Sequence, residues 1–251
     1  MGYVKTKGII LKEINTGEAD KIVTIFSRSH GKLTGSAKGA RRPKNKFAAA
    51  TQFLCYCDFV LYKGKDMYSI SSADIIEPFY EIRNDVFKLT YSAHMVDLVN
   101  DVIQENQPAA KVLQLFLNTL HMLAKTGKSP ELLIRIFEIR FMSIIGYAPY
   151  VKECMECNEC NADLKYFFSF RKCGTICGGC RTKDSNAVEL SQGALRALRH
   201  IVHTRFEDLY SFDLAPHILD ELGRISKRYI KDRLEREYKK LDFIKELENP
   251  I

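Results

Sequence analysis

The sequence predicts an α+β protein, with a five-stranded β-barrel at the N-terminus followed by a helical domain. Short runs rich in β-branched and aromatic residues fill the first 80 residues, and this composition is typical of strands. From residue 81 onward, apolar residues recur every three or four positions, which is the spacing of amphipathic helices. We therefore predict a barrel domain over residues 1–80 and a helical domain over residues 81–251. A cysteine module is expected inside the helical domain at about residues 150–185.

Five candidate strands in the barrel domain are separated by sequences typical of turns. Gly17 and Gly31 each lie in a short polar turn, and Lys63-Gly64-Lys65-Asp66 separates the last two runs. Five short strands in a domain of this size fit an OB-like barrel, and the strand pattern alone also allows an SH3-like barrel. The candidate strands cover residues 4–14, 22–27, 32–37, 53–62 and 68–77.

The helical domain begins with two stretches of helical periodicity, at about residues 86–99 and 109–124. A third helix opens with Ser129-Pro130-Glu131, which combines a capping residue, a proline in the first turn and an early acid. Gly146-Tyr-Ala-Pro149 ends this helix.

Helical periodicity returns after the cysteine module. Ser191 is placed to cap a helix that runs to about His203. Residues 216–247 fit one or two further helices. The stretch 224–240 carries eight basic and three acidic residues. A solvated helix face is the first interpretation of such a charge run, and a second nucleic-acid or protein surface is the alternative.

The most specific motif is a pair of Cys-x-x-Cys sequences separated by roughly twenty residues. A two-residue gap lets both thiolates of one turn face inward, and a second such turn completes a tetrahedron around a zinc ion. Cys160 and Cys173 offer two further thiols, so the spacing alone leaves the ligand set open. The symmetric set consists of Cys154, Cys157, Cys177 and Cys180.

Disulfides are the alternative, since six of the eight cysteines lie within 27 residues. The residues that follow Met1 lead directly into a strand pattern, without a secretory signal. We therefore expect a cytoplasmic chain whose thiols stay reduced, which favours a metal site. Four thiolate ligands leave no position for water or substrate, so the zinc is expected to stabilise the fold rather than to catalyse a reaction.

Positive charge is concentrated in the barrel domain. The whole chain has a net charge of +7, and residues 1–80 alone hold 13 Lys and Arg against 7 Asp and Glu, a net of +6. No acidic residue occurs between Lys21 and Cys57, where eight basic residues lie. This distribution indicates an anionic partner for the barrel domain.

Five of these cations crowd into residues 38–46, which we call the basic segment. Aromatic residues are frequent nearby, and cations beside exposed rings are the two parts of a groove for single-stranded nucleic acid. A solvated loop with core aromatics is the alternative, because alternation turns about half of the strand residues inward. The candidate nucleic-acid ligands are Lys21, Lys32, Lys38, Arg41, Arg42, Lys44 and Lys46.

No catalytic constellation is evident in the sequence. Lys125-Thr-Gly127-Lys128-Ser129 imitates the end of a phosphate-binding loop, but Met122 stands where that motif requires its first glycine. The segment also follows a helix instead of a strand. We therefore expect a protein that is not an enzyme and that has no means of using ATP.

These motifs together resemble the RecO family of bacterial recombination mediators. The resemblance runs from the N-terminus to Cys180 and is looser in the helices beyond. Two positions depart from the family pattern, which usually has glycine where this chain has Cys173 and Asn158. Besides the cysteines, the pieces that carry the resemblance are Gly8-Ile-Ile-Leu-Lys12, residues 17–24, His30-Gly-Lys32, residues 37–44, Leu61-Tyr-Lys-Gly64 and Gly146-Tyr-Ala-Pro149.

This resemblance implies an N-terminal OB-fold and a helical domain with an inserted zinc module. It implies zinc ligation by the symmetric cysteine set. It also implies binding of single- and double-stranded DNA, annealing of complementary strands, and loading of RecA, together with RecR, onto DNA coated by single-strand-binding protein. Such a protein would act in the cytoplasm, at the nucleoid.

A different class of function remains open at this point. The basic barrel would also suit an adaptor that binds the acidic tail of single-strand-binding protein and contacts DNA only weakly. Salt-dependent DNA affinity distinguishes the two, because a protein that neutralises phosphates loses affinity steeply as salt rises.

Overall fold

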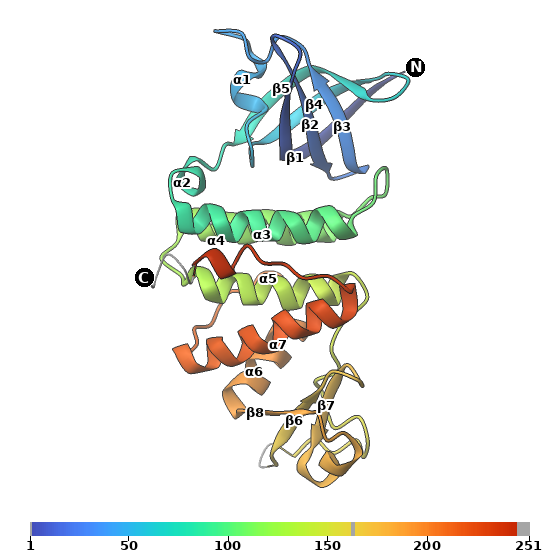
Figure 1. The fold of residues 1–251 in the computed structure, drawn as a ribbon, viewed down its shortest axis with the longest axis vertical. Helices are drawn as coiled ribbons and strands as arrows, with labels where there is room; N and C mark the ends of the chain where they lie inside the picture. Colours follow the sequence, from blue (N-terminus) through green and yellow to red (C-terminus); the bar gives the residue numbers. More distant parts are fainter. Residues whose placement is uncertain (1, 162–163, 245–251) are drawn as a thin grey trace. The chain divides into compact units, whose positions relative to one another are not determined.

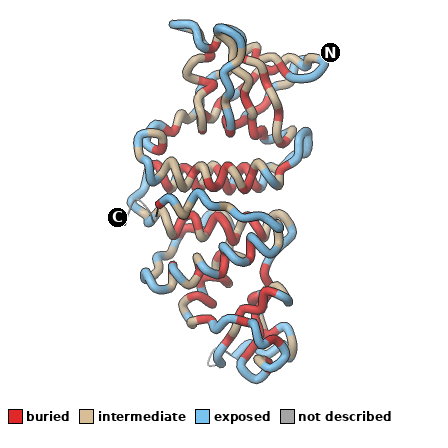
Figure 2. The backbone as a smooth tube through the Cα atoms, viewed as in Figure 1, coloured by how far each residue is buried: buried red, intermediate tan, exposed pale blue. Residues whose placement is uncertain are grey.

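The computed structural model describes residues 2–161 and 164–244. The chain divides into two compact units, Met1–Lys125 and Thr126–Ile251. Figure 1 shows the order of the elements along the chain, and Figure 2 shows which parts of each unit are buried.

The first unit begins with a closed five-stranded barrel. Its strands are β1 (Tyr3–Thr16), β2 (Asp20–Ser27), β3 (Gly31–Ala37), β4 (Tyr56–Lys63) and β5 (Tyr68–Glu77). Around the barrel they follow the order β1-β2-β3-β5-β4, in which only the β3–β5 pair is parallel. The predicted OB-like barrel is therefore confirmed (Figure 1).

Alternation along the strands fills the barrel with apolar side chains. Leu33 of β3 and Phe59 of β4 lie at its centre, and Cys55 and Cys57 pack there with their Sγ atoms 3.5 Å apart. The strand predicted to begin at residue 53 begins instead at Tyr56. A short helix, α1 (Phe47–Ala50), precedes it, and Leu54 adopts a left-handed conformation with φ of 63° that interrupts the extended chain.

Three helices complete the first unit: α2 (Tyr80–Arg83), α3 (Val86–Val102) and α4 (Ala110–Lys125). The carboxylate of Asp85 caps α3 by accepting from the backbone N–H groups of Phe87 and Lys88. The loop that joins α3 to α4 reaches the barrel, where Glu105 bridges to Gly31 at the start of β3. A Cβ on Gly31 would lie 2.1 Å from the carbonyl of Gln107, so only glycine permits this approach.

Among the described residues, the long helices of the second unit are α5 (Pro130–Ile144), α6 (Gln192–His203) and α7 (Pro216–Leu234), and residues 242–244 are also helical. Helix α5 packs against both of the others. The Arg140 guanidinium of α5 donates to the backbone carbonyls of Ile201, Val202 and Thr204. These carbonyls lie at the C-terminal end of α6, where the helix itself offers them no N–H partner. The side chain of Arg140, on helix α5, therefore caps α6.

The cysteine module of the second unit contains secondary structure that the periodicity does not reveal. It holds β6 (Tyr166–Ser169), β7 (Gly174–Cys177), β8 (Val188–Leu190) and the 3-10 helix η1 (Gly178–Lys183). The three strands form one sheet in the order β7-β6-β8. They are too short to show alternation. In the segment predicted as helix over 216–247, α7 ends at Leu234, and residues 245–247 lie outside the described residues.

Candidate metal centre and nucleic-acid interface

The two Cys-x-x-Cys pairs meet within the cysteine module. The first pair lies in the loop before β6, and the second spans the end of β7 and the start of η1. The four Sγ atoms all lie within 4.8 Å of one another, and those of Cys157 and Cys177 are 3.6 Å apart. Four sulfurs bound tetrahedrally at about 2.3 Å from zinc would be separated by about 3.8 Å. The cluster can therefore hold one metal ion.

The same distances distinguish this cluster from disulfides. A disulfide bond places its sulfurs about 2 Å apart, whereas every cysteine of the chain is a free thiol. Cys160 is exposed, and Cys173 makes its contacts elsewhere. The structure thus gathers Cys154, Cys157, Cys177 and Cys180 and leaves the other two thiols of the module outside the cluster.

Backbone groups around Cys154 favour its thiolate, the form that binds metal. Burial alone would raise the pKa of Cys154, but backbone N–H groups, including those of Cys177 at 3.3 Å and Glu156 at 3.4 Å, lower this pKa to about 6. Burial raises the pKa of Cys180 to about 12. Burial disfavours each further negative charge in such a cluster of thiols. A bound metal cation would offset this cost, because its positive charge stabilises the thiolates.

Two features fix the loops that present the cysteines. Glu156, between the first two ligands, pairs with Lys172 and with Lys183, whose Nζ lies 2.8 Å away. The hydrogen bond to Lys172 is the main reason that the pKa of Glu156 falls to about 2. Asn158 and Cys173 both have a φ of 58°. This left-handed region favours glycine, so the side chains of Asn158 and Cys173 are held in a backbone conformation that few other residues adopt.

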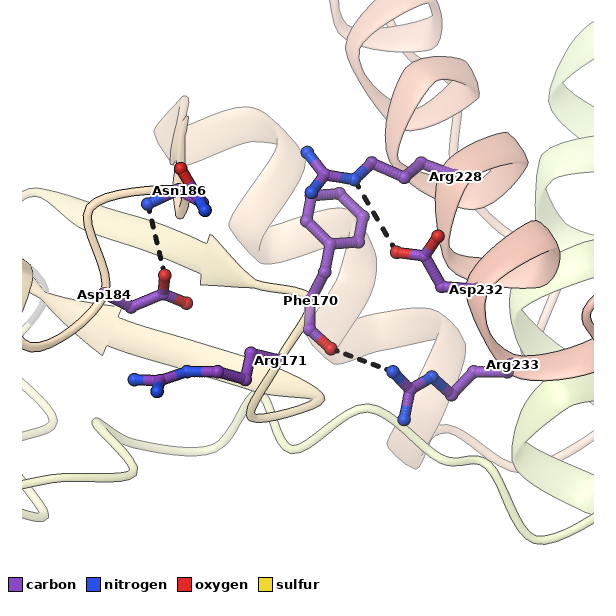
Figure 3. A pocket seen from close by; sticks show the side chains of 7 residues that line it. All are labelled: Phe170, Arg171, Asp184, Asn186, Arg228, Asp232 and Arg233. Carbon is purple, nitrogen blue, oxygen red and sulfur yellow. Dashed lines mark hydrogen bonds and ion pairs between the residues drawn. The ribbon is translucent and has the colours of Figure 1, made fainter.

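A cavity of about 240 Å³ lies where the turn after β6 meets α7, and Figure 3 shows the side chains that line it. The Arg228 guanidinium lies 4.0 Å from the centroid of the Phe170 ring, and its Nε lies 3.6 Å from the carboxylate of Asp232. Arg233 donates to the carbonyl of Phe170 and to the sulfur of Cys173. The arginines thus bind α7 to the cysteine module. The cavity lining is mainly charged, with three arginines and two aspartates, and it contains no histidine.

The basic segment is a loop of the barrel whose backbone is fixed and whose cations are exposed. The N–H of Gly39 donates to the carboxylate of Asp20 at 2.7 Å, and the N–H of Arg41 donates to the carbonyl of Ala19 at 2.9 Å. The guanidinium of Arg41 donates to the carbonyl of Gly17, and the ammonium of Lys46 donates to the carbonyl of Ser71, each at 3.3 Å. The exposed cations are those of Lys38, Arg41, Arg42, Lys44 and Lys46.

The two remaining candidate ligands lie in different surroundings. Lys21 is only 14% exposed and pairs with Glu13 of the neighbouring strand β1. The ammonium of Lys32 donates to the backbone carbonyl of Asn100 at the end of α3. Both cations therefore contact other parts of the first unit. The five cations of the basic segment are gathered on one loop.

The aromatic residues of the barrel divide into a core set and an outer set. The rings of Phe47, Phe59 and Tyr68 are buried. Tyr62 is partly exposed and packs edge to face with Tyr3, which is 69% exposed. Tyr3 was not among the residues predicted to bind nucleic acid. Its position in the alternation of β1 would have placed it on the outer face.

No helix among the described residues has the length and apolar character needed to cross a membrane.

Known protein families resemble both the N-terminal and the C-terminal part of this chain. Residues 1–79 match the family model described as Recombination protein O N terminal, and residues 83–242 match the one described as Recombination protein O C terminal. Three curated relatives are each named DNA repair protein RecO. The chain is 56% identical to that of Acetivibrio thermocellus over 99% of this chain and 98% of the relative. It is 37% identical to that of Caldicellulosiruptor saccharolyticus over 98% of this chain and 99% of the relative. It is 30% identical to that of a Thermoanaerobacter species over 99% of this chain and 100% of the relative.

Proposed function

Since this chain belongs to the RecO family of DNA repair and recombination proteins, we propose that it binds single- and double-stranded DNA and anneals complementary strands. With RecR, it helps to load RecA onto DNA coated by single-strand-binding protein. It acts at the nucleoid in the cytoplasm. It is not an enzyme, and it hydrolyses no nucleotide.

The observation that carries this proposal is the exposed basic segment. Five cations lie on one loop whose backbone is held by the β1–β2 turn. Phosphate contacts of this kind supply most of the affinity in binding that is indifferent to sequence. We therefore assign the first contact with DNA to the barrel domain over residues 1–80, centred on the basic segment.

Concentrated positive charge also gives a physical route to annealing. Two single strands repel each other, and a cationic surface that neutralises their phosphates lowers the cost of bringing them together. Contacts to phosphates leave the base edges able to find their complements. Stacking in the new duplex then favours release from a surface suited to single strands.

The cysteine cluster has a supporting role in this proposal. We assign to it one zinc ion held by Cys154, Cys157, Cys177 and Cys180, which fits the separation of their sulfurs. When bound, zinc would join the loop before β6 to the end of β7. Because four thiolates fill its coordination sphere, it would stabilise the module without activating water.

The proposal predicts salt-dependent DNA binding by the full chain. Fluorescence anisotropy of labelled single- and double-stranded DNA, titrated at several salt concentrations, should show affinity that falls linearly on a log–log plot. Strands of different sequence should give the same slope. An adaptor for the acidic tail of single-strand-binding protein would instead bind that tail peptide and show little affinity for bare DNA, which would contradict the proposal.

A further inference from the structure

The outer face of the barrel carries a row of residues that strand pairing brings together. β1 and β4 are antiparallel neighbours, with Tyr3 opposite Tyr62 and Lys5 opposite Val60. Val4 and Leu61, the next pair in register, contribute to the barrel core. Because side chains alternate across a strand, Tyr3, Lys5 and Tyr62 point away from that core.

The two tyrosines form an aromatic surface at one end of the barrel. Their ring centroids lie 5.4 Å apart with an interplanar angle of 62°, and Tyr3 is 69% exposed. Of the large apolar side chains that are exposed in the described part of the chain, Tyr3 has the highest exposed fraction. Packing in the barrel does not require such a ring, since its inward neighbour Val4 makes the core contact.

Three lysines lie at the same end of the barrel as this aromatic pair. The N–H of Lys63 donates to the carbonyl of Gly2, which holds the β4–β5 hairpin beside the start of β1 (Figure 1). Lys5, Lys63 and Lys65 are exposed, and none of them has an ion pair among residues 2–161 and 164–244. Asp66 is the one acidic residue of the hairpin 63–67. The hairpin therefore carries two lysines against one aspartate, and Lys5 adds a third cation on β1, which favours an anionic ligand at this end of the barrel.

We propose that Tyr3 and Tyr62 form a base-stacking platform for single-stranded nucleic acid, with phosphates held by Lys5, Lys63 and Lys65. The inference deepens the proposed function and rests on it. Exposed rings beside cations are the parts from which sequence-tolerant single-strand sites are built, because every base has a face that can stack. The platform would hold bases, whereas the basic segment, on a different loop, contacts phosphates only.

The chain itself supplies a sensitive test, because it contains no tryptophan. A Tyr3→Trp variant places a single indole on the platform, at a position exposed enough to accept it. We expect oligo(dT) to quench its emission and an abasic strand of the same length and charge to leave the emission unchanged. Tyr80→Trp is the matched control, since Tyr80 is 51% exposed but lies in α2, and its emission should not respond to either strand.

Affinity provides the second measurement. Tyr3→Ala should weaken binding of oligo(dT) by at least about five-fold, the lower end of what loss of one stacked base costs. The slope of log affinity against log salt should not change, because no phosphate contact is lost. Tyr3→Phe should keep the parent affinity.

The outcomes separate this inference from the function on which it rests. If anisotropy shows that oligo(dT) binds while the emission of the Tyr3→Trp variant is unaffected and Tyr3→Ala keeps full affinity, the platform is refuted and the proposed function stands. If quenching is as strong with the abasic strand, the site holds phosphates only, and base stacking is refuted. If the parent protein binds no DNA, the proposed function fails and the platform fails with it.

Discussion

Replacing Cys177 by serine is expected to release the bound metal and to unfold most of the cysteine module. Cys177 ends β7, its sulfur lies 3.6 Å from that of Cys157, and its N–H donates to the sulfur of Cys154. Binding of structural zinc contributes about 10 kcal/mol or more of apparent free energy in small modules. Elemental analysis should find about one zinc per parent chain in reducing buffer and none in the variant. Hydrogen exchange should lose protection in β6 and β7 and keep it in the buried parts of α5.

The matched control for this variant is Cys160→Ser. Cys160 is exposed and lies outside the cluster, so this variant should keep its zinc and its protection. Loss of zinc from Cys160→Ser would show that the ligand set is wrong. Parent protein without zinc would refute the metal site altogether.

Removing the four cations at positions 41, 42, 44 and 46 is expected to weaken DNA binding and to flatten its salt dependence together. Each phosphate contact to a single strand contributes about 0.7 to the slope of log affinity against log salt, so four contacts contribute about 2.8. The side chains are exposed, and the backbone bonds of Gly39 and Arg41 that fix the loop do not depend on them. The fold should therefore be retained. The variant combines Arg41→Ala, Arg42→Ala, Lys44→Ala and Lys46→Ala.

A control that removes the same amount of charge distinguishes local contact from a change in overall charge. It replaces by alanine four exposed cations that lie outside the barrel: Lys111, Lys152, Arg196 and Arg205. This control should keep both the affinity and the slope of the parent. If the two variants behave alike, the basic segment has no special role and is only a solvated loop.

Local patterns in the sequence were sufficient to predict the barrel and the two Cys-x-x-Cys turns, but the spacing did not decide which four of the six thiols gather. Alternation in β3, where Leu33 and its i±2 neighbours are buried, is visible in the residues themselves. The two-residue gaps between cysteines likewise fix the geometry of each turn without reference to the rest of the chain. The start of β4 could not be predicted in this way, because the left-handed Leu54 is buried and its N–H donates to the carbonyl of Ile10, a residue of β1 that is distant in the sequence.

Features that depend on contacts between residues far apart in the sequence could not be predicted from local patterns. Nothing near Lys32 in the sequence indicates that its ammonium contacts the carbonyl of Asn100, and Lys21 meets Glu13 only through the β1–β2 register. Tyr3 and Tyr62 are 59 positions apart and become neighbours through the pairing of β1 with β4. Predicting such contacts requires the strand register, which the residue pattern of one strand does not contain.

Annealing in the absence of nucleotide tests the central claim most directly. Complementary strands carrying a fluorescent donor and acceptor would be mixed with the parent chain, without ATP, and pairing followed by energy transfer. We predict pairing faster than in the protein-free reaction, a rate that falls as salt rises, because screening weakens the contacts to phosphates, and a slower rate for the variant that lacks the four cations. Pairing no faster than without protein, or pairing that requires added ATP, would contradict the account.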